Sequence, residues 1–142
     1  PETCTWDGLT SRFTPKYEGT ISGHLGTART PATRQDLLVD GFARPVRAWA
    51  RDGTVVFVEV DATDADQSLP TRLGEPGGTL DYYFITTKHE GGALVYPDKG
   101  LALLSNAERS SVIKVLLFSS TTLEAYDTSL HHPVDPVRRL KR

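Results

Sequence analysis

The sequence predicts a mainly β protein, an antiparallel meander that forms a small β-barrel or β-sandwich with one late α-helix. Two observations favour this class: short apolar segments follow one another through turn residues, and strands do not alternate with helices. The 142 residues fit one domain, in which residues 17–127 form the β-rich part between an N-terminal arm (1–16) and a basic C-terminal tail (128–142).

Composition excludes several classes of protein. A single cysteine cannot form an intrachain disulfide framework. The net charge of −2 disfavours a nucleic-acid partner, because such proteins usually carry an excess of positive charge. No apolar run approaches the roughly 18 residues of a transmembrane helix. The chain begins at Pro1, so we expect a processed N-terminus that allows a removed signal peptide; the compartment stays open between secreted or periplasmic and cytoplasmic.

The first part of the chain contains the clearest element. We expect residues 1–16 to be irregular, 17–25 to form a strand and 26–35 to form a loop. Residues 44–51 and 54–61 are joined by Asp52-Gly53, the residue pair that two-residue hairpin turns favour. Regular pairing would place Trp49 opposite Val56. Both faces of this hairpin are then largely apolar, which predicts that each face is covered.

The second half is expected to continue as short strands before one helix. A polar loop (61–78) leads to a strand (80–88), a turn (90–92) and two short strands (93–96 and 101–104). Ser105 and Glu108 have the spacing of a helix N-terminal capping box, and apolar residues follow at helical spacing, which favours a helix over 106–118. The alternative is a buried strand over 112–118. Residues 119–126 are expected to add one more strand.

Most familiar catalytic and metal-binding patterns are absent. The sequence has no glycine-rich phosphate loop and no nucleophile-elbow motif. Its four histidines lack the spacing of a zinc site. The acidic loop around Asp64 and Asp66 has a leucine where a calcium loop of this length needs glycine. We therefore expect neither a metal nor a cofactor.

Two charged residues lie on the apolar hairpin and need explanation. Arg47 and Glu59 should each have a partner or meet water in a cavity, because an isolated buried charge is very costly. Stacking of Arg47 on Trp49 is the plain structural explanation for the arginine. The expected register places Val46 opposite Glu59, so the partner of Glu59 must come from elsewhere.

These residues suggest a ligand site. Aromatic and polar groups near one sheet often line small-molecule sites, so the candidate ligand-binding residues are Trp49, Arg47, Tyr82 and Tyr83. For an enzyme, Glu59 and His89 would be the candidates for proton transfer.

The first hypothesis for function is a non-catalytic binding domain that holds a small apolar ligand or a protein partner. The second is a small β-barrel enzyme, an isomerase, cyclase or hydrolase-like catalyst. The third is an accessory subunit of a larger assembly. A homo-oligomer stays open under each of them.

Overall fold

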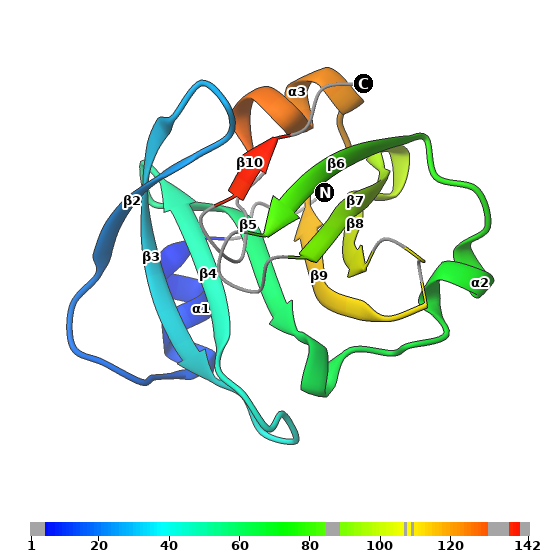
Figure 1. Ribbon diagram of the computed structural model, residues 1–142. Helices are drawn as coiled ribbons and strands as arrows, with labels where there is room; N and C mark the ends of the chain where they lie inside the picture. The colour runs from blue at the N-terminus through cyan, green and yellow to red at the C-terminus, as the bar shows by residue number, and fades with distance from the viewer. Residues whose placement is uncertain (1–4, 85–88, 107, 109, 131–136, 140–142) are drawn as a thin grey trace.

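The computed structural model describes residues 5–84, 89–106, 108, 110–130 and 137–139, and it is mainly β. All strand pairs are antiparallel, in the order β1-β3-β4-β5-β9-β8-β7-β6-β10, with β2 also pairing with β3 (Figure 1). The strands are β1 (Thr14–Pro15), β2 (Ile21–Leu25), β3 (Thr30–Leu38), β4 (Val46–Arg51), β5 (Thr54–Asp61), β6 (Gly78–Phe84), β7 (His89–Tyr96), β8 (Leu101–Asn106), β9 (Val112–Phe118) and β10 (Val137–Arg139). The helices are α1 (Trp6–Arg12), α2 (Leu69–Leu73) and α3 (Leu123–Ser129), with 3₁₀ turns at Ala62–Asp64 and Pro97–Lys99.

The sheet curves so that its two ends share one core, although hydrogen bonds do not close it into a barrel. Leu25 and Ala32, near one end of the strand order, belong to the same buried cluster as Leu80 and Ala93, near the other end. We call the face that this cluster occupies the interior and the opposite face the exterior. Among the described residues, no helix is long and apolar enough to cross a membrane.

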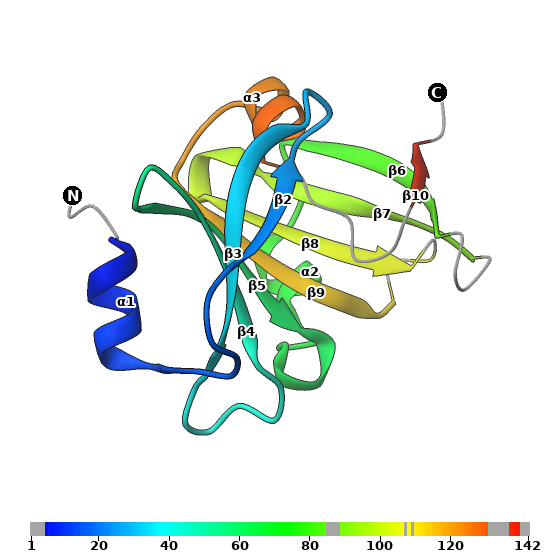
Figure 2. The same ribbon diagram turned by 90° about the vertical axis from the view of Figure 1, so that its left-hand side faces the viewer.

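Helix α3 lies over one end of the strands (Figures 1 and 2). Thr122 caps its first turn by accepting a hydrogen bond from the Ala125 N–H, as capping threonines commonly do. Tyr126 is fully buried, with its ring 4.8 Å from that of Phe118 and 6.4 Å from that of Phe57. The turn between β2 and β3 donates two backbone hydrogen bonds to carbonyls at 127 and 128, so α3 fixes this end of the sheet.

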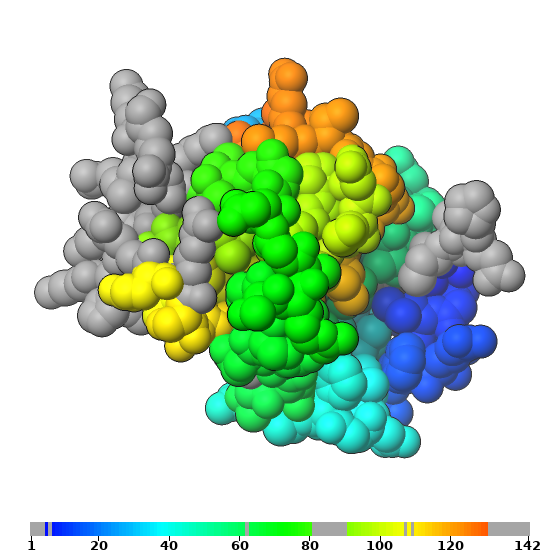
Figure 3. Space-filling model, turned by 90° about the vertical axis from the view of Figure 1, so that its right-hand side faces the viewer, coloured from blue at the N-terminus to red at the C-terminus, as the bar shows by residue number. Residues whose placement is uncertain are grey.

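The exterior is covered by two segments. Residues 61–77, including α2, cross the exterior of β7, β8 and β9, where Leu69 and Leu73 pack on a second buried cluster (Figure 3). Gln67 binds both the N–H and the C=O of Val112 through its side-chain amide, which attaches this segment to β9. Helix α1 passes from a bridge between Thr5 and Thr54 to the pairing of β1 with β3, so it crosses the exterior of β4.

The predicted hairpin is confirmed, and so is its burial on both faces. Asp52 and Gly53 have φ values of 51° and 78°, as a two-residue turn of this kind requires. Val46 and Ala48 are buried on one face, and Trp49 and Phe57 are buried on the other.

The register predicted beyond the turn is wrong. Arg51 does pair with Thr54, but a bulge between Trp49 and Ala50 leaves Val56 unpaired. Trp49 therefore pairs with Phe57, and Arg47 pairs with Glu59 instead of Val58. The extra residue moves Glu59 onto the same face as Trp49.

The predicted helix over 106–118 is also wrong, because Val112–Phe118 is strand β9. Asn106 provides the reason. Its side-chain oxygen accepts hydrogen bonds from the N–H groups of Ser110 and Ser111, which closes a tight loop where the helix was expected to begin. The β-branched residues of β9 then pack on both faces of the sheet.

Other boundaries differ as well. A strand, β3, replaces the loop expected over 26–35, and helix α3 replaces the strand expected over 119–126. Residues 90–92 lie within β7, whereas a turn was expected there. The arm contains α1, and the tail contributes β10 to the sheet. The end of the strand expected at 85–88 lies outside the described residues.

Candidate functional site

The interior of the sheet changes character along its strands. Next to α3 it is filled by large apolar side chains, which we call the apolar end: Leu25, Phe57, Leu80, Leu116, Phe118 and Tyr126. Further along the same strands it carries five charged side chains, which we call the charged end: Arg34, Asp36, Arg47, Glu59 and Lys114. Directly paired residues share a face of a sheet, so the pairings Asp36–Arg47, Arg47–Glu59 and Glu59–Leu116 place these groups on the interior.

Glu59 is the most deeply buried member of the charged end, with a side chain that is 0% exposed. Its Oε2 accepts a hydrogen bond of 2.6 Å from the indole Nε1 of Trp49. Its Oε1 lies 3.5 Å from the Lys114 Nζ. The expected register was wrong, because Arg47 and not Val46 lies opposite Glu59, and the contacts of Glu59 come from Trp49 in β4 and Lys114 in β9.

Lys114 was missed because the segment that contains it was interpreted as a helix. In β9 it lies two residues from Leu116, so it shares the interior face with Glu59. Its side chain is 6% exposed. A buried carboxylate and a buried ammonium stabilise one another's charged forms, and this pair satisfies the need for a counter-ion on both sides.

Arg34 and Asp36 enter the charged end from β3. The Arg34 Nε lies 3.0 Å from the Asp36 Oδ1. The two groups form an ion pair, but the N–H is not directed at the oxygen, so they do not form a hydrogen bond. The Arg34 guanidinium carbon is 5.8 Å from the centre of the Trp49 ring, a cation–π distance. Stacking on Trp49 was expected from Arg47, and the structure assigns it to Arg34. Arg34 was missed because it falls in the loop expected over 26–35, and Asp36 follows that loop in a stretch for which no element was predicted.

Arg47 is half-buried between two acidic neighbours that bind other groups. Its partners across β3 and β5 are Asp36 and Glu59; Asp36 pairs with Arg34, and Glu59 contacts Trp49 and Lys114. Among the described residues, the Arg47 guanidinium has no hydrogen bond or ion pair.

Three buried polar atoms of the charged end lack a hydrogen bond within the described chain: Arg34 Nε, Asp36 Oδ1 and Glu59 Oε1. Most buried polar atoms in folded proteins have such a bond. Their concentration in one part of the interior distinguishes it from the apolar end, which needs no polar partner.

Tyr82, Tyr83 and His89 are only partly located. Tyr82 and Tyr83 lie in β6, and His89 is the first residue of β7, paired in register with Phe84. Their side chains lie outside what the structure describes. The structure therefore brings together Trp49, Arg47 and Glu59 from the expected site and adds Arg34, Asp36 and Lys114.

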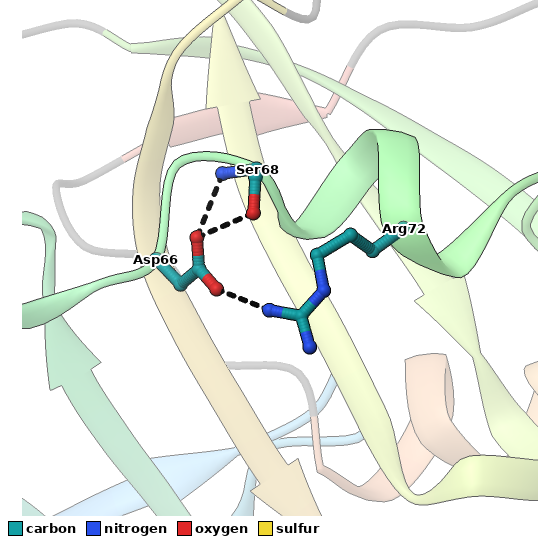
Figure 4. Close-up of polar contacts among 3 residues, drawn as sticks. All are labelled: Asp66, Ser68 and Arg72. Carbon is teal, nitrogen blue, oxygen red and sulfur yellow. Dashed lines mark hydrogen bonds and ion pairs between the residues drawn. The ribbon is translucent and has the colours of Figure 1, made fainter.

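The acidic loop uses its carboxylates to hold local structure. Asp66 accepts hydrogen bonds from the N–H and hydroxyl of Ser68 and forms a 2.5 Å ion pair with Arg72 (Figure 4). The Ser68 bonds, followed by Arg72, hold the pKa of Asp66 below its ordinary 3.8. Asp64 accepts from the backbone N–H groups of Ala43 and Arg44. Within the described residues, no three acidic, histidine or cysteine side chains converge on a metal position.

One basic group, Arg51, and one acidic group, Asp61, have shifted pKa values beside the interior. Burial lowers the pKa of Arg51, whose guanidinium donates to the Ser129 carbonyl. Partial burial alone would raise the pKa of Asp61, but hydrogen bonds from Thr63 and the nearby Lys114 and Arg44 lower it overall.

A groove of about 510 Å³ lies on the exterior, across β2, β3 and the end of β4. Its polar lining includes Ser22, His24, Thr33 and Asp52. None of the buried polar atoms without a hydrogen bond lies among its lining residues.

No protein-family model, curated protein or solved structure matches this chain.

Proposed function

We propose that this chain is a non-catalytic binding domain that holds a small organic ligand at the charged end of its interior. The observation that supports this proposal is the group of buried polar atoms without hydrogen bonds beside Trp49, Leu104 and Leu116. Small-molecule sites combine mainly apolar and aromatic walls with a few placed polar groups. In this proposal the curved sheet acts as a barrel-like or sandwich-like container, with Trp49 as the aromatic wall.

The proposal gives each residue a role. Trp49 would contact the ligand body, while Arg34 and Arg47 would provide polar recognition. Glu59 would hold the Trp49 indole in place and provide the counter-ion of Lys114. Tyr82 and Tyr83 remain candidate ligand contacts from β6.

The enzyme alternative receives less support from this geometry. A general base must reach a substrate proton directly or through one water molecule. Glu59 Oε2 is already bonded to Trp49, and Oε1 faces Lys114. Such fixed contacts suit a residue that positions its neighbours. The accessory-subunit alternative stays a prediction.

The test is an NMR titration of the purified chain with a library of small organic molecules. The indole N–H signal of Trp49, identified by its absence from Trp49→Phe, should shift on binding because Glu59 holds this group at the proposed site. The control variant Tyr17→Phe changes an exposed aromatic side chain and should bind normally. Ligands that shift only the amide signals of Ser22, His24 and Thr33 would move the site to the exterior groove.

A further inference from the structure

We propose that the ligand at the charged end carries a single carboxylate, which Arg47 binds; this inference rests on the proposed function. The charged end contains three cations and two anions. Arg34 pairs with Asp36, and Lys114 pairs with Glu59. The two pairs use both carboxylates, so Arg47 is the cation left over.

Asp61 does not supply the missing anion. It pairs in register with Lys114 at the end of β5, and its carboxylate accepts hydrogen bonds from the N–H and hydroxyl of Thr63. Its electrostatic partners are Lys114 and Arg44. Among the described residues, neither Asp61 nor any other carboxylate forms an ion pair with the Arg47 guanidinium.

The position of Arg47 makes this charge significant. An exposed arginine is stabilised by water alone, but Arg47 is half-buried on the face that also buries Trp49 and Glu59. Removing a charge from water is costly unless an opposite charge compensates for it. Asp36 and Glu59 flank Arg47 but pair with other groups, so a ligand anion would provide the direct ion pair that Arg47 lacks among the described residues.

The geometry of arginine and the local charges select the kind of anion. The planar guanidinium presents paired N–H donors that match the two oxygens of a carboxylate. One unmatched cation balances one negative charge. A phosphate dianion would carry more charge than Arg47 balances, and Asp36 and Glu59, on either side of Arg47, would repel the excess. A monocarboxylate with an apolar body therefore fits best.

The test compares octanoate with octan-1-ol, which share an apolar body and differ in the head group. Affinities are measured by NMR titration on the Trp49 indole signal at neutral pH. A charge-assisted hydrogen bond contributes enough that octanoate should bind about ten- to a hundredfold more tightly than octanol. Arg47→Gln should remove this preference, and Arg47→Lys should retain part of it.

Arg44→Gln is the matched control because it removes the same charge from an exposed position in the preceding loop, and it should keep the preference. The amide spectrum of each variant checks its fold. Equal binding of the two molecules, or an unchanged preference in Arg47→Gln, would overturn the carboxylate inference and leave the binding proposal standing. If neither molecule shifts Trp49 while other library members do, the inference again fails alone; if nothing in the library binds, both fail.

Discussion

The two ends of the interior use the same strands for opposite purposes. On β5, Phe57 belongs to the apolar end and Glu59, two residues later, to the charged end. On β9, Leu116 belongs to the apolar end and Lys114, two residues earlier, belongs to the charged end. The apolar end is completed by α3 and stabilises the fold by burial. The charged end keeps buried polar atoms without hydrogen bonds, a cost to stability that a ligand site would explain.

The largest expected effect lies at the apolar end. Tyr126→Ala should destabilise the protein by about 3–5 kcal/mol, because it removes a fully buried ring that packs on Phe57 and Phe118. Urea unfolding measures the change. Tyr17→Ala removes an exposed ring and should change stability by less than about 0.5 kcal/mol. Equal effects of the two substitutions would contradict the assignment of α3 to the core.

The next effect concerns the ion pair of the charged end. Glu59→Gln should cost about 3 kcal/mol, because it leaves Lys114 buried without a counter-ion. The double variant Glu59→Gln/Lys114→Met should recover much of this loss. A double-mutant cycle by urea unfolding measures the coupling. Additive effects of the single substitutions would show that the two side chains do not interact.

A smaller effect tests how α3 is attached. Gly26 and Gly53 both have φ of +78°, so alanine costs about 1–2 kcal/mol at either position. A Cβ at Gly26 would also lie 2.0 Å from the Thr128 carbonyl oxygen, whereas a Cβ at Gly53 meets nothing within 4 Å. Gly26→Ala should therefore lower the melting temperature more than Gly53→Ala. Equal shifts would argue against the contact between this turn and α3.

The smallest effect is a dependence on pH. The folded protein lowers the pKa of Asp61 below its ordinary 3.8, so ionised Asp61 contributes stability above that pH. This contribution disappears as the pH falls from about 4 through the lowered value in the folded state. Asp61→Asn should lower the urea midpoint at pH 7 and weaken its decline toward pH 3. An unchanged pH profile in this variant would exclude Asp61 from the effect.

Local sequence signals predicted some of the fold and failed for identifiable reasons. Asp52-Gly53 specifies its turn through backbone conformation alone, so the hairpin was predicted correctly. The bulge after Trp49 depends on packing against other strands and left no such signal. Strand β3 was missed because Pro31, Arg34 and Asp36 break the apolar pattern, and the latter two face the charged end.

Only the residues that the β4–β5 hairpin contributes to the site were predicted from the sequence. A charged residue on an apolar strand drew attention to Glu59 and Arg47, and the structure places both in the interior with Trp49. Their neighbours from β3 and β9 could not be found in the same way, because those segments were assigned to a loop and a helix. Contacts between distant strands require the topology of the whole sheet.

The most direct test of the central claim is a crystal structure of the protein with 8-bromooctanoate, in which anomalous scattering locates the bromine. We predict that the carboxylate lies within hydrogen-bond distance of the Arg47 guanidinium and that the alkyl chain contacts Trp49. A well-occupied ligand in the exterior groove beside His24, with the charged end of the interior closed to it, would contradict the account.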